Sequence, residues 1–308
     1  GLNIDWLDKN QLLALLPDFS LIVLGGVLRV TLSPDAWKAI DRLNFQVLFP
    51  ALIFTAALSK APDAGDVLVV GVGVWLIIGL GFCLAWPLRR LGPERFLDFA
   101  GLWQTAWRFN TALAFVAVQT LPETHRALMS IAIGMAVPLA NVLAIGALSR
   151  GHALSLSKMI RQIVTNPFFV ASVAGMTLSM LRVEINPLML KPVRMLATAA
   201  VPIALLSIGA SLNWRALARV DRFSAALNAI KLVILPATTW ALATAIGVDP
   251  VRTAVLTLFA ALPTASAAHV LASVFGADRE AVATLIAQST LIGCVSLPLW
   301  LAFLNSFA

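Results

Sequence analysis

The chain has 308 residues, of which 60% are hydrophobic and 12% charged, and its mean hydropathy is +0.90. This composition excludes an ordinary soluble domain and predicts an integral membrane protein. The net charge of +7 does not indicate nucleic-acid binding, because the Lys and Arg residues are spread over many short segments instead of forming a basic arm.

Ten apolar segments follow one another along the chain, and each is long enough to cross a bilayer, which takes roughly 20 helical residues. In chain order they lie at about 11–31, 36–58, 65–89, 98–121, 124–148, 159–181, 187–212, 222–247, 250–275 and 279–305. The connections between them are short and leave no room for a separate catalytic or nucleic-acid-binding domain. The sequence therefore predicts an all-α membrane protein with ten transmembrane helices.

The second half of the chain repeats the proline and glycine pattern of the first at an offset of about 150 residues. The recurring pairs are Pro17 and Pro167, Gly25 and Gly175, Pro50 and Pro202, and, with the offset increased to 160, Pro138 and Pro298. Each half contains five predicted spans, and because five is odd the two copies insert in opposite orientations. We therefore predict two inverted five-helix repeats, residues 1–150 and 151–308, an architecture typical of secondary transporters.

Two of the predicted spans carry proline or polar residues near the middle of the membrane. These residues are Arg108, Asn110 and Thr111 in the fourth span, and Pro263, Thr264 and Ser266 in the ninth. Proline breaks the hydrogen-bond ladder of a helix, and polar groups at this depth are costly and usually functional. We expect both spans to be broken there and to cross, so that two positive helix N-termini lie at mid-membrane and can bind an anion.

These residues are the candidate substrate-binding site, although each has a second interpretation. Pro263 alone is also compatible with a simple kink, and Arg108 with a structural cation that bridges the carbonyl ends of the half-helices. Lys231, deep in the eighth span, is interpreted as a supporting counter-charge for those carbonyl ends rather than as a substrate ligand. His269 is a second supporting residue, which is either a satisfied interior histidine or one that titrates during proton coupling.

The acidic residues lie in predicted loops or near span ends, and none is adjacent to either break. A cation-binding antiporter of this architecture needs a carboxylate at the breaks, so the electrostatics favour an anionic substrate. The sequence also lacks an HExxH motif, a Cys/His cluster with metal spacing and a Walker loop. We therefore expect neither an enzyme nor a bound metal or cofactor.

The distribution of Lys and Arg predicts the orientation in the membrane, because cytoplasmic loops are enriched in these residues. With both termini outside, the cytoplasmic connections hold 13 of them, namely Arg29, Lys38, Arg42, Arg89, Arg90, Arg95, Arg150, Lys158, Arg161, Arg215, Arg219, Arg222 and Arg279. The outer connections hold seven, namely Lys9, Lys60, Arg126, Arg182, Lys191, Arg194 and Arg252. We therefore expect both termini to face the exterior of the cell's inner (plasma) membrane.

The helices that surround the breaks are expected to move together, which divides the ten spans into two bundles. Spans 1, 2, 6 and 7 would form a frame, and spans 3–5 and 8–10 would form a carrier. A single repeat would leave the backbone polar groups of its broken helix without hydrogen-bond partners, so each repeat needs the other repeat packed against it.

The chain resembles the auxin efflux carrier family, which includes bacterial organic-acid permeases, over its whole length. The most specific match is residues 261–300, which resemble the family's ninth and tenth spans through the motifs LP-x-A, A-x-x-FG-x-D, ST and LP in this order. In addition, LFPALIF at 48–54 resembles the family's second span, and Arg-x-Asn-Thr at 108–111 resembles its first break. The resemblance implies a homodimeric, ten-span elevator-type carrier, of the bile acid/sodium symporter type of fold, with a site around Asn110 and Pro263. The chain departs from the family in two places. It has ALAFVAVQT after the first break, where the family usually has glycines and a proline, and its connection of about ten residues between spans 5 and 6 indicates a bacterial or short-loop member.

The sequence therefore predicts a secondary transporter that moves a small organic anion, a carboxylate, through the bilayer, without a nucleic-acid partner. Two other functions are compatible with the same fold. One is a sodium-coupled organic anion symporter. The other is a membrane sensor that does not transport, for which the missing Gly and Pro after Asn110 are the only support.

Overall fold

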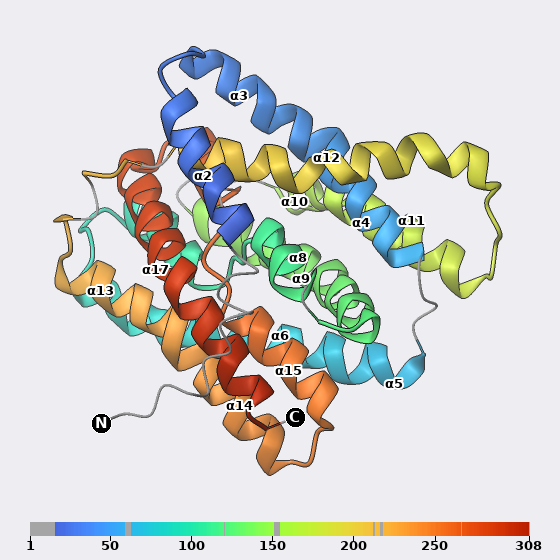
Figure 1. Ribbon diagram of the computed structural model, residues 1–308. Helices are drawn as coiled ribbons and strands as arrows, with labels where there is room; N and C mark the ends of the chain where they lie inside the picture. Colours follow the sequence, from blue (N-terminus) through green and yellow to red (C-terminus); the bar gives the residue numbers. More distant parts are fainter. Residues whose placement is uncertain are drawn as a thin grey trace.

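The computed structural model describes residues 16–58, 63–119, 121–150, 155–211, 213–215, 218–265 and 267–307, and all regular structure within these ranges is helical (Figure 1). Five helices in them are long and apolar enough to cross a membrane: Ala64–Arg90, Glu123–Ser149, Pro187–Ser207, Arg222–Ala245 and Arg279–Asn305. They coincide with the third, fifth, seventh, eighth and tenth predicted spans. Of the other five predicted spans, the second is a continuous helical run over 34–58 that contains a π-helical turn, and the remaining four correspond to shorter or interrupted helices, so the count of ten stays a prediction.

One packed group of helices occupies the upper part of Figure 1 and comes from two distant stretches of the chain. Its members are α2 (Leu16–Leu28), α3 (Pro34–Leu43), η1 (Asn44–Leu48, one π-helical turn), α4 (Phe49–Leu58), α10 (Leu156–Val164), α11 (Pro167–Met180) and α12 (Pro187–Ser211). α2 packs against α12, and α4 packs against both α11 and α12. These contacts join residues more than 100 positions apart in the chain.

The contact between α2 and α12 depends on a glycine from each helix. A Cβ atom on Gly25 would overlap the backbone of Leu206, and one on Gly209 would overlap the backbone of Ile22. Small residues of this kind let two helix backbones approach closely, which is how helices in lipid gain packing energy. The same group is also joined by a hydrogen bond from Asn44 Nδ2 to the carbonyl of Ala200, at 3.2 Å.

The remaining helices form a second group, which occupies the left side and the lower part of Figure 1. Its members in the first half are α5 (Ala64–Asp66), η2 (Val67–Gly71), α6 (Val72–Ala85), η3 (Trp86–Arg90), α7 (Phe96–Trp103), η4 (Gln104–Ala106), α8 (Thr111–Gln119) and α9 (Glu123–Ser149). Those in the second half are α13 (Arg222–Ala229), η6 (Ile230–Ile234), α14 (Leu235–Ala245), α15 (Pro250–Ala260), α16 (Ala267–Phe275) and α17 (Arg279–Asn305). α9 packs against α6 and α15, and α16 packs against α17.

Helices α8 and α9 are the members of the second group that lie next to the first group in Figure 1, and they make contacts that join the two groups. α9 contacts α4 and α11 of the first group, while α8 contacts α12. The side chains of Leu68, Leu76, Leu188 and Val295 point outward and are each more than 60% exposed. A surface rich in large apolar side chains is stable in lipid and unstable in water, which agrees with a membrane protein.

Aspartates set the starts of three helices in the second half. Asp221, Asp249 and Asp278 each accept a hydrogen bond from a backbone N–H in the first turn of α13, α15 and α17, respectively. Such N-caps satisfy donors that have no partner inside the helix. These helices consequently begin at 222, 250 and 279, where the hydropathy pattern predicts the spans to begin.

Candidate functional site

The first interruption lies in the fourth predicted span. α7 tightens into the 3₁₀ turn η4, residues 107–110 are not helical, and α8 starts at Thr111. Asn110 starts the new helix, because its Oδ1 accepts the Leu113 N–H at 3.1 Å and its carbonyl accepts the Ala114 N–H at 3.0 Å. An Asn in this position satisfies the free N–H groups of a helix start.

The second interruption lies in the ninth predicted span, between the end of α15 at Ala260 and the start of α16 at Ala267. Residues 262–265 are not helical, and Ser266 lies outside the described residues. Pro263 has no N–H to donate. The next N–H, of Thr264, donates to Oγ of Ser289 on α17 at 3.4 Å. Pro263 itself packs against Gly293 of α17, where an added Cβ atom would collide with the proline ring.

The two interruptions touch each other, although they are about 150 residues apart in the chain. The backbone N–H of Asn110 donates to the carbonyl of Pro263 at 2.9 Å. Beside this bond, the rings of Phe109 and Phe259 stack with their centroids 4.3 Å apart. Two segments that have each left the helix thus satisfy one another's backbone groups, as segments buried in a membrane protein must.

Arg108 is buried at the first interruption, with 6% of its surface exposed. Its Nε donates to Oε1 of Gln104 at 2.9 Å, and Nε2 of Gln104 donates to the carbonyl of Ala268 in α16 at 3.0 Å. Within the described part of the chain, the two terminal guanidinium nitrogens of Arg108 have no hydrogen-bond acceptor. Arg108 therefore keeps two charged donors for another group.

Lys231 is the second buried cation, only 2% exposed, and belongs to the π-helical segment η6. Its Nζ donates to the carbonyl of Leu262 at 2.9 Å and lies 3.2 Å from the centroid of the Phe109 ring. One ammonium group thus contacts both interruptions. A carbonyl at the end of α15 carries partial negative charge and an aromatic face attracts cations, so both contacts favour the charged amine.

The other predicted residues are placed near these contacts without taking part in them. Thr111 is half-buried as the first residue of α8. Thr264 is 1% exposed, and its hydroxyl has no hydrogen-bond partner among the described residues. His269 is half-buried on α16. The structure thus joins Asn110 to Pro263 directly, places Lys231 between Leu262 and Phe109, and connects Arg108 to α16 through Gln104. Among the described residues, no hydrogen bond links the side chain of Thr111 or His269 to these contacts.

Four residues at the interruptions were not singled out as candidates by the sequence: Gln104, Phe109, Ser289 and Gly293. For Gln104 a signal was present, because it lies four positions before Arg108 and residues so spaced share one face of a helix. Ser289 belongs to the ST pair of the family-like stretch. Nothing in the sequence distinguishes Phe109 or Gly293 from the many other apolar residues and glycines of the chain.

The buried charge near the interruptions is positive. In the described part of the chain the buried charged side chains are Arg108, Lys231 and Asp66. Asp66 forms an ion pair with Arg252 at 2.8 Å. Arg252 lies at the start of α15, whereas the second interruption follows the other end of this helix, so the negative charge of Asp66 is far from the interruption. The described residues also contain no group of three or more His, Cys, Asp or Glu side chains that could hold a metal ion.

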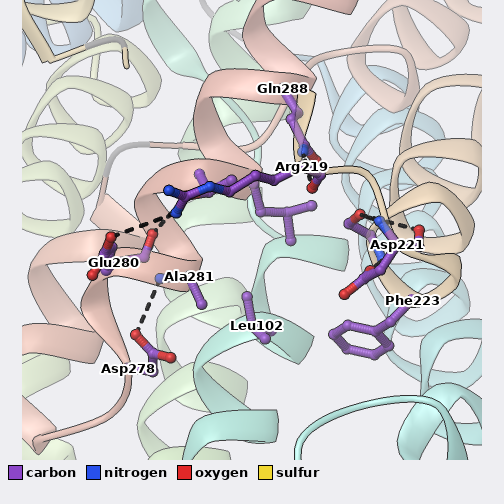
Figure 2. Close-up of a pocket in the computed structure, with 11 residues that line it drawn as sticks. Leu102, Arg219, Asp221, Phe223, Asp278, Glu280, Ala281 and Gln288 are labelled. Carbon is purple, nitrogen blue, oxygen red and sulfur yellow. Dashed lines mark hydrogen bonds and ion pairs between the residues drawn. The ribbon is translucent and has the colours of Figure 1, made fainter. Parts of the chain in front are cut away.

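A separate cavity of about 330 Å³ lies where α13 and α17 begin (Figure 2). It is lined by Leu102, Arg219, Asp221, Phe223, Ser224, Asp278, Glu280, Ala281, Thr284, Leu285 and Gln288. Figure 2 shows Arg219 reaching across to Glu280, and the two charged groups are 3.9 Å apart. Both side chains are mostly exposed, so this ion pair contributes little stability. None of the predicted site residues lines this cavity.

Comparison with known proteins identifies the family. A family model described as "Membrane transport protein" matches residues 149–301. Over the second half of its length, the chain matches this membrane transport family. The match confirms the resemblance to the auxin efflux carriers and their relatives, and this family consists of membrane transporters, not enzymes. The chain is therefore a multi-pass membrane transport protein.

Two relatives carry descriptions that agree with this family. One, from Rhizobium meliloti (strain 1021), is described as "Putative malonate transporter"; it is 28% identical over 291 residues, which cover 90% of each chain. The other, from Methanothermobacter thermautotrophicus (strain Delta H), is described as "Uncharacterized transporter". It is 32% identical over 105 residues, which cover 34% of this chain and 35% of the relative.

Proposed function

We propose that the protein is a secondary transporter that moves a small organic anion, a carboxylate, across the inner membrane. The observation that carries the proposal is the contact between the two interruptions, beside which Arg108 keeps two charged donors without an acceptor in the described chain. A guanidinium group presents its donors in a fork that matches the two oxygens of a carboxylate. The relative described as a malonate transporter supports a carboxylate substrate as well.

The substrate would bind where the starts of α8 and α16 face the interruptions. Each helix start carries about +0.5 charge, which adds to that of Arg108. Asn110 uses its backbone N–H and Oδ1 within the protein, and its side-chain NH₂ has no acceptor among the described residues, so this NH₂ is the donor left for a ligand. The hydroxyls of Thr111, Thr264 and Ser266 would supply further donors, and Pro263 would keep the second interruption open. Lys231 would support the site from behind, because its ammonium is already occupied by Leu262 and Phe109.

Transport would follow an elevator-type alternating-access mechanism in a ten-span inverted repeat. The group containing α2, α4, α11 and α12 would be the frame, and the group containing both interruptions the carrier. The separate packing of the two groups supports this division, as do α9 and α17, which are both 27 residues long and occupy matching places in the two halves. Sliding of the carrier along the frame would expose the same site to each side in turn. Two copies would form a homodimer through the frame helices α2, α4 and α12.

A two-part experiment tests the proposal. The purified protein is heated with a panel of mono- and dicarboxylates, malonate included, and any carboxylate that raises its melting temperature is then offered in radiolabelled form to proteoliposomes. We expect stabilisation by at least one carboxylate and its saturable uptake, compared with liposomes without protein. Uptake that requires sodium would indicate the sodium-coupled symporter, and binding without uptake would indicate a sensor. A protein that binds no carboxylate would contradict the proposal.

A further inference from the structure

Gln104 occupies the position between Arg108 and the start of α16, and its side chain is completely buried. Both ends of its amide are used: Oε1 accepts from Nε of Arg108, and Nε2 donates to the carbonyl of Ala268. We propose that Gln104 is the positioning residue of the anion site, which orients the Arg108 guanidinium for end-on binding of one carboxylate. This inference rests on the proposed function.

The two hydrogen bonds allow a single orientation of the Gln104 amide. If the amide were flipped, its NH₂ group would face the Nε–H of Arg108, and its oxygen would face the carbonyl oxygen of Ala268. Both contacts would be repulsive, because they would pair a donor with a donor and an acceptor with an acceptor. The backbone of α16 therefore determines which atom Gln104 presents to Arg108.

The orientation of Gln104 in turn determines how Arg108 can bind a carboxylate. A guanidinium can hold a carboxylate side-on, through Nε and one terminal nitrogen, or end-on, through both terminal nitrogens. Because Gln104 occupies Nε, only the end-on mode remains. The hydrogen bond to Gln104 fixes the orientation of the Arg108 guanidinium before the substrate binds. Binding therefore costs less side-chain entropy than it would with a freely rotating guanidinium.

A double-mutant cycle separates this positioning role from a merely structural one. The Gln104→Met substitution removes both hydrogen bonds with little change of volume, and it is made in the wild type and in Arg108→Lys, which keeps the charge but has no fork. The probe is the carboxylate that most stabilises the wild type. We expect Gln104→Met to lower its affinity about tenfold in the wild type, because one oriented charge-assisted contact is worth about that factor, and by less than twofold in Arg108→Lys.

The matched control is Gln288→Met. Gln288 is also a buried glutamine whose amide is bonded at both ends, to Asn228 and to the carbonyl of Arg219, and it is not one of the proposed ligands. We expect this variant to lose a similar amount of thermal stability and to keep wild-type affinity. Equal losses of affinity in Gln104→Met and Gln288→Met would overturn the positioning role, as would the same loss in both Arg108 backgrounds.

Gln104→Glu keeps the inference testable if Gln104→Met does not fold. This variant preserves the shape and the acceptor for Nε, but it places a negative charge beside the fork. We expect the affinity for the carboxylate to fall by more than about tenfold relative to the wild type, although Glu is close to Gln in shape. Wild-type affinity in Gln104→Glu would overturn the inference. A wild-type protein that binds none of the carboxylates would instead overturn the proposed function, and this inference with it.

Discussion

Arg108 should contribute more to carboxylate binding than the hydroxyl of Thr264. Arg108 keeps charged donors that have no acceptor in the described chain, whereas the hydroxyl of Thr264 is a neutral donor. A bond to a charged group contributes about 1.5–3 kcal/mol and a neutral one about 1 kcal/mol. Arg108→Ala should therefore weaken carboxylate binding by roughly 10- to 150-fold and Thr264→Ala by about fivefold. Titration of both purified variants with the identified carboxylate measures this, and equal effects would make Arg108 a structural cation.

Lys231 should contribute mainly to stability, because its ammonium is occupied by the Leu262 carbonyl and the Phe109 ring. Lys231→Ala leaves a buried carbonyl without a partner and should cost about 2–3 kcal/mol. Lys231→Met, which keeps the volume, should cost less. Thermal unfolding in detergent measures the loss, and ligand titration below the melting temperature should give an affinity within about threefold of wild type. A Lys231→Met protein that is stable but binds no carboxylate would show that Lys231 is a ligand.

At the scale of helices, the second interruption depends on close packing between Pro263 and α17. An added Cβ atom at Gly293 would collide with the proline ring, and overpacking of this kind costs about 1–3 kcal/mol. We expect Gly293→Ala to lower the melting temperature and to weaken carboxylate binding. Gly79→Ala in α6 is the control, because a Cβ atom there would meet nothing within 4 Å. Equal behaviour of the two variants would contradict the packing role of Gly293.

At the scale of the whole molecule, the expected orientation follows from the distribution of Lys and Arg over the connections. Cysteines introduced singly at Ala153 and Leu217 should react with a membrane-impermeant maleimide only after permeabilisation, whereas one at Glu184 should react in intact cells. The background lacks Cys83 and Cys294, of which Cys83 is exposed. Labelling of positions 153 and 217 from outside would invert the topology. It would also exchange the sides to which the proposed carrier opens, without altering the site.

Much of the architecture could be predicted from the sequence, because it depends on properties that lie along the chain. Hydropathy predicted the five long helices within a few residues, since a span in lipid needs a continuous apolar run. Proline and polar residues interrupt a helix locally, and the chain is not helical at 107–110 and 262–265, near Asn110 and Pro263. That these interruptions belong to a ten-span inverted repeat stays a prediction. The positive charge at the interruptions follows from the positions of Arg108 and Lys231 and from the lack of nearby acidic residues.

Only the tertiary structure decided which groups satisfy one another at the site. The pairing of Asn110 with Pro263, of Lys231 with Phe109 and Leu262, and of Gln104 with Ala268 joins segments 31 to 164 residues apart. A buried polar group must find a partner, but the sequence does not say which partner, because that depends on how helices from both halves pack. Gly293 shows the same limit, since its lack of a side chain matters only where Pro263 lies against it.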